Sequence, residues 1–143
     1  MPVPGLEDAL HSLKQGRATI DPATRAEITP ARFILFETQF GRRHTATGKL
    51  IDFLVWIDTP LDVALARKVR QFSSGPGLRA QSEAQAFVQW LQEYLDNYLD
   101  LVGTLLRRQR DTVRADADLV VDGELESGEL VRLVGEKVLA SRR

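Results

Sequence analysis

The 143-residue sequence predicts an α/β fold in which a parallel sheet is packed against helices. Two short apolar runs, "RFILF" and "IDFLVWID", have the composition of strands that are buried on both faces. Segments with helical periodicity alternate with these runs, and neither repeats nor low-complexity stretches interrupt the pattern. We therefore expect one α/β domain over 1–143, which is long enough to bury a sizeable core.

The first half of the chain is expected to form one helix, a connection and two strands. Residues 17–32 contain Pro22 and Pro30 and predict an irregular connection or a short hairpin. The strands are predicted at 33–36 and 51–58. The helix is predicted over about 5–15, with Gly16 placed to end it, by four apolar residues at helical spacing: Leu6, Ala9, Leu10 and Leu13.

The second half begins with a strand-to-helix turn, where Thr59 can cap a helix and Pro60 suits its first position. Residues 73–81 read as a lid-like loop. Ser82 and Gln85 resemble a capping box that opens a long helix to about residue 110. A third strand in "ADLVVDG" and a closing helix complete the pattern; the apolar residues of that helix are Leu130, Leu133, Val134 and Val138.

Composition and charge exclude several classes of function. The net charge is −1, with 43% hydrophobic and 27% charged residues, which gives no whole-chain reason to expect binding to nucleic acid or membrane. The chain has no cysteine, and His11 and His44 are too few for a histidine-rich metal site. With no signal-peptide pattern and no apolar run of about 18 residues, we expect a cytoplasmic protein.

The Gly48-Lys49 pair raises the question of a phosphate-binding loop. The motif G-x-x-x-x-G-K-[ST] needs a glycine at position 43 and a hydroxyl residue at position 50, where this chain has Arg43 and Leu50. A helix should also begin at the pair, whereas a strand is expected from Ile51. We therefore do not expect "TATGKL" to bind phosphate as such a loop.

The order of these segments resembles the C-terminal two-thirds of a uridine-kinase-like phosphotransferase of the P-loop kinase superfamily. The most specific pieces are the strand followed by Glu37 and the stretch "IDTPLDVALARKVRQF", and the resemblance extends from near Pro4 to about Gly123. It implies a three-layer P-loop kinase-like parallel sheet with helices on both faces. That sheet would be incomplete, because the first strand and the phosphate loop of the family would precede Met1.

The resemblance also implies an activity. The complete enzyme would use ATP and Mg²⁺ to phosphorylate a nucleoside or another small hydroxyl-bearing acceptor, and the chain alone is expected to be inactive.

The missing strand would leave a gap in the sheet. In the family's strand order, 2-3-1-4-5, this strand lies between 33–36 and 53–58, so an upstream segment or a second copy is expected to fill the gap. The alternative is a non-catalytic remnant that binds a protein through exposed strand edges. An unrelated α/β domain would instead pair 33–36 directly with 53–58.

The resemblance implies catalytic roles for three residues. Glu37, directly after a predicted strand, would orient magnesium-bound water or accept the proton of the acceptor hydroxyl. Arg67 and Arg70 share a helix face and would neutralise charge on the transferring phosphoryl group. The plainer interpretations are a strand-end carboxylate bonded to backbone and a basic helix face in water.

Other residues are predicted to bind ligands. Arg42, Arg43 and His44 could hold an acceptor's phosphate or carboxylate, or form a solvated loop. Arg25 follows Pro22 where uridine kinases recognise the nucleoside, and is predicted on the acceptor side. The cofactor-binding candidates are Arg79, which could close over the ATP phosphates, and Asp122, which ends a strand near the expected nucleotide base; a turn-forming Asp-Gly is the plainer reading for Asp122.

An aromatic stripe and a group of aspartates are interpreted as structural features and not as binding sites. The helical period of Trp90, Tyr94 and Tyr98 is shared with leucines, so core packing is expected in place of base stacking. Asp111, Asp116 and the neighbouring Asp118 lack the glycine and the distal glutamate of a calcium loop, so no metal site is predicted.

Overall fold

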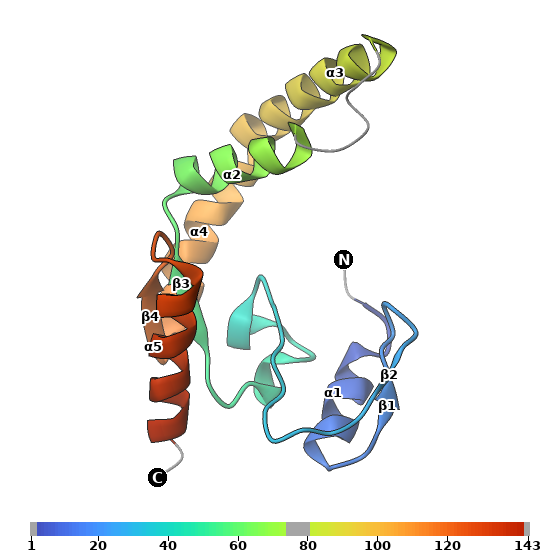
Figure 1. The fold of residues 1–143 in the computed structure, drawn as a ribbon, viewed down its shortest axis with the longest axis vertical. Helices are drawn as coiled ribbons and strands as arrows, with labels where there is room; N and C mark the ends of the chain where they lie inside the picture. The colour runs from blue at the N-terminus through green and yellow to red at the C-terminus, as the bar shows by residue number, and fades with distance from the viewer. Residues whose placement is uncertain (1–2, 74–80, 142–143) are drawn as a thin grey trace. The chain divides into compact units, whose positions relative to one another are not determined.

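The computed structural model describes residues 3–73 and 81–141, and their contacts divide the chain into two compact units, 1–54 and 55–143 (Figure 1). The second unit contains a two-stranded parallel sheet and most of the helices, so the protein is a mixed α/β structure. The predicted lid-like loop at 73–81 lies almost wholly outside the described residues.

The first unit is built on one helix and a hairpin. Helix α1, Leu6–Lys14, buries Ala9, Leu10 and Leu13 and is followed by Gly16 at φ 74°, which confirms the predicted helix and its glycine stop. Strands β1, Thr19–Ile20, and β2, Glu27–Ile28, pair antiparallel. The connection at 17–32 is therefore the short hairpin that its prolines allow.

The strand predicted at 33–36 is not formed. These residues have no regular secondary structure, and the side chains of Phe33, Ile34 and Leu35 are 42%, 38% and 100% exposed. Apolar composition indicated burial, but a strand also requires a hydrogen-bonded neighbour, and the only strand pairs among the described residues are β1 with β2 and β3 with β4. The prediction that Glu37 follows a buried core strand is thus wrong.

The segment around Gly48 is a compact turn. Two short 3₁₀ helices, Gly41–Arg43 and Gly48–Leu50, pack together, and a Cβ on Gly48 would collide with the backbone carbonyl of Arg42. The chain continues from Ile51 in extended conformation, so no α-helix begins at the Gly-Lys pair. Gly48 therefore serves close backbone packing.

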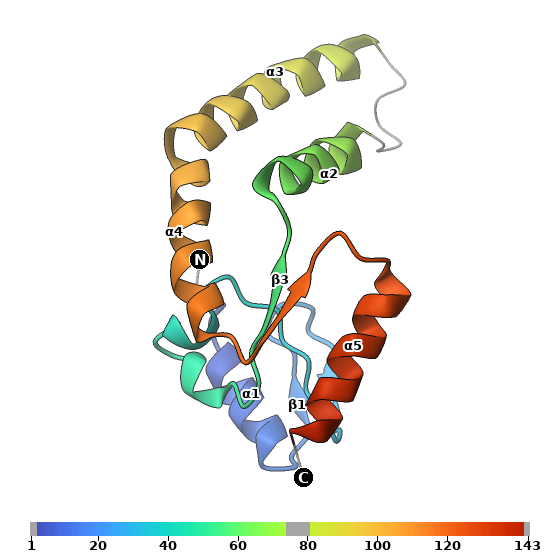
Figure 2. The same ribbon diagram turned by 90° about the vertical axis from the view of Figure 1, so that its left-hand side faces the viewer.

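The second unit contains a parallel strand pair and a helical crossover (Figure 2). Strand β3 is confined to Val55–Asp58, shorter than the predicted 51–58, and pairs in parallel with β4, Leu119–Asp122. The register aligns Val55 with Leu119 and Asp58 with Asp122. The helices are α2, Leu61–Ser73, α3, Gln81–Asn97, α4, Gly103–Val113, and α5, Ser127–Ala140, which contacts β4.

The predicted long helix is continuous but changes its pitch. Helices α3 and α4 are joined by a π-helical segment, Tyr98–Val102, and a Cβ on Gly103 would lie 2.9 Å from the carbonyl oxygen of Tyr98. A glycine therefore fits where the widened turn brings the backbone of Tyr98 close. The capping-box residue Ser82 lies where no side chain is described, so its role in opening the helix is untested.

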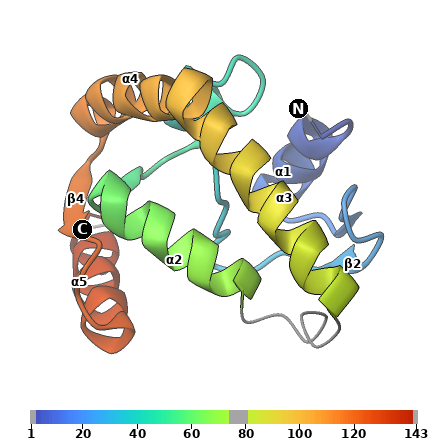
Figure 3. The same ribbon diagram turned by 90° about the horizontal axis from the view of Figure 1, so that it is seen from above.

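Aromatic side chains hold α2 against α3, which lie side by side (Figure 3). The ring of Trp90 is the centre of this cluster, with centroid distances of 4.5 Å to Phe72, 5.7 Å to Phe87 and 5.2 Å to Tyr94. Trp90 and Tyr94 therefore pack against neighbouring rings, as their helical period predicts, but both are half-buried and lie outside the buried core.

Replacing Trp90 with alanine is expected to destabilise the second unit by about 2 kcal/mol, because three neighbouring rings lose their common partner. The matched control is Val88→Ala on the same helix, where the side chain is 54% exposed and a loss below about 0.5 kcal/mol is expected. Urea unfolding followed by circular dichroism measures both. Equal losses in the two variants would contradict the proposed packing role.

Candidate functional site

The carboxyl ends of β3 and β4 bring the strongest group of polar residues together. Asp58 and Asp122 end the two strands in register, and the amide of Gly123 donates a 3.1 Å hydrogen bond to the carbonyl oxygen of Asp58. In open α/β sheets, ligands bind beyond the carboxyl ends of parallel strands. This edge is the candidate functional site, and all of its residues belong to the second unit.

Asp58 accepts hydrogen bonds from three side chains. The Nε atoms of Arg110 and Arg114 lie 3.2 and 3.0 Å from its two carboxylate oxygens, and the indole Nε1 of Trp56 lies 3.3 Å from Oδ1. The two arginines can reach one carboxylate because they stand four residues apart, where Arg110 in α4 and Arg114 just after it share one face. The Asp58 side chain is only 17% exposed.

These contacts change the acidity of Asp58. The hydrogen bond from Trp56 is the largest cause that lowers the pKa of Asp58 below its ordinary value. The hydrogen bond from Arg114 and the positive charges of Arg110 and Arg114 act in the same direction, while burial opposes them. Asp58 therefore stays ionised and can hold both arginines in place.

Arg67 ties helix α2 to the end of β4. Its Nη1 donates a 2.8 Å hydrogen bond to the carbonyl oxygen of Gly123. Gly123 is buried against the start of α2, and a Cβ at this position would collide with the hydroxyl of Thr59. The strand end must therefore be glycine for β4 to approach this turn so closely.

Two cavities border these residues. The first, of about 330 Å³, is lined by Asp58, Pro60, Arg110, Val120, Val121, Asp122 and Glu124. The second, of about 410 Å³, is lined by Arg110, Asp111, Arg114 and Ala115. Arg110 borders both cavities.

Asp122 also has a structural role beside the first cavity. Its Oδ1 accepts a 2.8 Å hydrogen bond from the amide of Glu124, which is the turn-forming interaction expected of an Asp-Gly pair.

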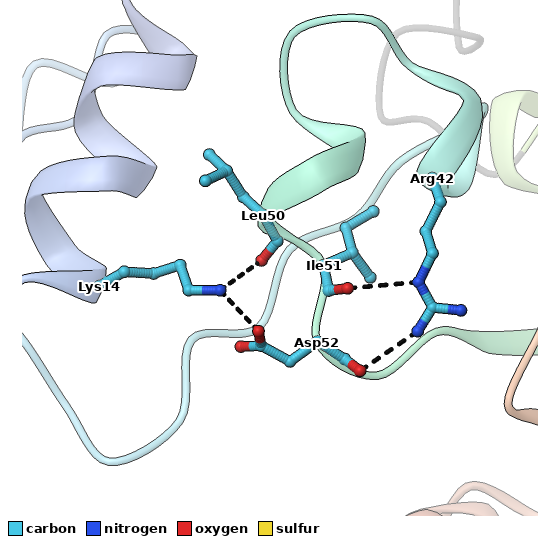
Figure 4. A network of polar contacts seen from close by, with 5 residues as sticks. All are labelled: Lys14, Arg42, Leu50, Ile51 and Asp52. Atoms are coloured by element: carbon cyan, nitrogen blue, oxygen red, sulfur yellow. Dashed lines mark hydrogen bonds and ion pairs between the residues drawn. The ribbon is translucent and has the colours of Figure 1, made fainter.

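Arg42 and His44 have structural partners in the first unit. Figure 4 shows Arg42 donating to the carbonyl oxygens of Ile51 and Asp52, at 3.3 and 3.2 Å. Lys14 holds the same segment through the carbonyl of Leu50 and the carboxylate of Asp52. His44 Nδ1 lies 2.9 Å from the hydroxyl of the buried Thr47. Both side chains fasten the 41–52 segment.

The remaining predicted residues are distributed over the chain. Arg43, Glu37 and Arg25 are exposed residues of the first unit, with Arg25 at φ 64° in the hairpin turn. Arg70 is exposed on α2, one turn after Arg67. Arg79 lies outside the described residues. Of the predicted site residues, the structure thus brings Arg67 and Asp122 to one strand edge.

Sequence reasoning missed Arg110 and Arg114. Their i, i+4 spacing was visible, but a basic helix face is common, and the partner Asp58 is more than 50 residues away in sequence. In the sequence, Asp58 stands out only as part of the stretch "IDTPLDVALARKVRQF". It accepts from Trp56, Arg110 and Arg114 because the fold brings the end of α4 to the end of β3.

Residues 3–73 and 81–141 provide no group of three histidine, cysteine or acidic residues arranged to hold a metal ion. In the same residues, no helix has both the length and the apolar character that a bilayer crossing requires.

Comparisons with protein-family models, with curated proteins and with solved structures found no significant match.

Replacing Gly123 with alanine is expected to destabilise the second unit by about 2 kcal/mol or more, because the new methyl group overlaps Thr59. Gly128→Ala is the matched control, since a Cβ there meets no atom within 4 Å and alanine favours helix α5. Urea unfolding measures both variants. A Gly123→Ala protein as stable as the parent would contradict the close approach of β4 to the α2 turn.

The lowered pKa of Asp58 predicts a pH-dependent contribution to stability. Ionised Asp58 stabilises the fold above the unfolded-state pKa of about 4, and this stability is lost as the pH falls through the lower folded-state pKa. The parent should exceed Asp58→Asn by about 1 kcal/mol near pH 7, and the difference should shrink below about pH 4.

Urea unfolding of parent and Asp58→Asn across this pH range measures the difference. Asp21, whose pKa is lowered by hydrogen bonds from the amide of Ala23 and the hydroxyl of Thr24, is present in both proteins, so its contribution cancels. A stability difference that stays constant or widens in acid would refute the assigned role of Asp58.

Proposed function

We propose that this chain is part of an ATP-dependent phosphotransferase that acts on a nucleoside or another small hydroxyl-bearing acceptor. The observation that carries the proposal lies at the carboxyl ends of two parallel strands, where Arg67 donates to the carbonyl of Gly123 and the neighbouring Asp122 lines a cavity of about 330 Å³. Ligands of open α/β sheets bind beyond the carboxyl ends of the parallel strands.

The proposed chemistry transfers the γ-phosphoryl group of ATP to an acceptor oxygen. A new P–O bond forms to the acceptor, the bond to the β-phosphate oxygen breaks, and ADP leaves. Arg67 and Arg70, on one helix, neutralise charge on the transferring group, and the proton of the acceptor hydroxyl passes to solvent water. Asp122 lies on the nucleotide side.

Mg²⁺ enters this proposal bound to ATP. Magnesium in nucleotide sites keeps several waters and uses one or two protein carboxylates together with the phosphates. Asp122 and Glu124 line the first cavity and offer such carboxylates. A cytoplasmic location, where ATP is abundant, is part of the proposal.

The phosphate cradle is assigned to polypeptide outside these 143 residues. The sequence contains no G-x-x-x-x-G-K-[ST] motif, and Gly48 is packed against the Arg42 backbone. The proposal therefore expects no phosphoryl transfer by the chain alone, because the arginines would act without a loop that fixes the phosphates.

A second candidate is a protein-interaction module without catalysis. It is favoured by the apolar segment Phe33, Ile34 and Leu35, which is exposed to solvent and belongs to no helix or strand. An exposed apolar segment of this kind is suited to adding to the strand edge of a partner. The two candidates differ in whether the second unit recognises MgATP.

Titration with MgATP tests the phosphotransferase proposal. The chain alone is expected to bind weakly, with NMR shifts centred on the amides of Asp122 and Gly123. A chain extended by the residues encoded directly upstream of Met1 is expected to bind at least about tenfold tighter, because added phosphate contacts are charge-assisted. In that extended chain, Arg67→Gln should reduce phosphoryl transfer about a hundredfold.

Lys68→Gln is the matched control, since Lys68 is an exposed neighbour on the same helix and its Nζ lies over the Phe72 ring, not at the strand ends. Absence of a strand and phosphate-loop motif in the upstream sequence, or MgATP shifts remote from β3 and β4, would overturn the proposal. Either result would leave the interaction module as the favoured candidate.

A further inference from the structure

The arginine pair on α4 has hydrogen-bonding capacity that Asp58 does not use. Arg110 meets the carboxylate edge-on through Nε at 3.2 Å and Nη2 at 3.5 Å, and Arg114 uses Nε at 3.0 Å. Within the described part of the chain, these are the hydrogen bonds of both guanidinium groups. Nη1 of Arg110 and both Nη atoms of Arg114 therefore remain available as donors.

We propose that Arg110 and Arg114 form a binding site for a phosphate-type anion in the cavity of about 410 Å³ that they line. Both arginines line this one cavity, and a guanidinium group with unused N–H donors can bind two oxygens of a phosphate. The inference does not depend on the phosphotransferase proposal, because that proposal assigns no role to Arg110 or Arg114.

Asp58 acts as the positioning residue of this site. It engages the arginines mainly through their Nε atoms and so restricts their rotamers. Their side chains are nevertheless 44% and 47% exposed, against 17% for Asp58. Two half-exposed cations are thus fixed before a ligand arrives, which reduces the entropy that binding must overcome.

The surrounding charge narrows the class of ligand. Arg107 and Arg108 on the same helix add positive charge, which favours an anion. Asp111 also lines the cavity, however, and its carboxylate would repel a bare phosphate while accepting a hydrogen bond from a donor. The expected ligand is therefore a small phosphate-bearing molecule that also carries an amino or hydroxyl group.

Two simple probes test this inference. Inorganic phosphate and phosphoethanolamine, which adds an amino group, are titrated into the ¹⁵N-labelled chain at low ionic strength while the arginine Nε–H resonances are followed. Arg110→Gln and Arg114→Gln should each weaken binding of both probes about threefold or more. Each single variant leaves the other arginine and Trp56 on Asp58, so both variants are expected to fold, which circular dichroism checks.

Control variants separate this site from general electrostatic attraction. Arg107→Gln and Arg108→Gln remove the same charge from the same helix, but neither residue lines the cavity, and binding should change less than about 1.5-fold. Asp111→Asn should tighten inorganic phosphate about twofold and weaken phosphoethanolamine, because the carboxylate repels one probe and attracts the amino group of the other.

The site is overturned if Arg110→Gln and Arg114→Gln bind both probes as the parent does, or if the control variants lose as much affinity. It is also overturned if Asp111→Asn changes neither probe, since the anion then binds elsewhere. Because neither probe contains a nucleotide, a failure to bind MgATP would not produce any of these results.

Discussion

The parallel register of β3 and β4 is the constraint on which the second unit depends. It aligns Asp58 with Asp122 and brings Gly123 against Thr59, so that the arginines of the candidate site reach one strand edge from the helices. Two strands of four residues have little stability by themselves. The helices therefore stabilise the pair, α5 by contact with β4 and α2 and α4 by arginine contacts at the strand ends.

Asp58 links the stability of the strand pair to the proposed anion site, because the same contacts serve both. Exposed ion pairs usually contribute little, but a carboxylate that is 17% exposed and accepts from Trp56, Arg110 and Arg114 forms a small network in which each contact positions the others. Arg110 borders both cavities, and Arg114 borders the second. The two guanidinium groups that fasten α4 to the sheet therefore remain accessible to an anion from solvent.

Apolar side chains in water are the other notable property of the chain. Leu35 is fully exposed, and Val131 and Leu139 on α5 are 69% and 52% exposed, while few large side chains are buried among the described residues. Exposed apolar surface on a folded chain is typical of contact with another polypeptide. Both candidate functions involve such a contact, either with a segment that supplies a phosphate cradle or with a partner at a strand edge.

Local pattern in the sequence determined α1 with its glycine stop, the long helix and the third strand, because helical periodicity and helix stops are properties of neighbouring residues. It left an irregular connection or a hairpin open at 17–32, and it expected Pro60 as the first residue of a helix that begins at Leu61. It also placed Arg67 and Asp122 among the site candidates. It failed for 33–36 and for 51–54, and it missed Arg110 and Arg114. Strand formation and an ion pair that spans more than 50 residues both require a partner remote in sequence, and only the tertiary structure decides which remote residues meet.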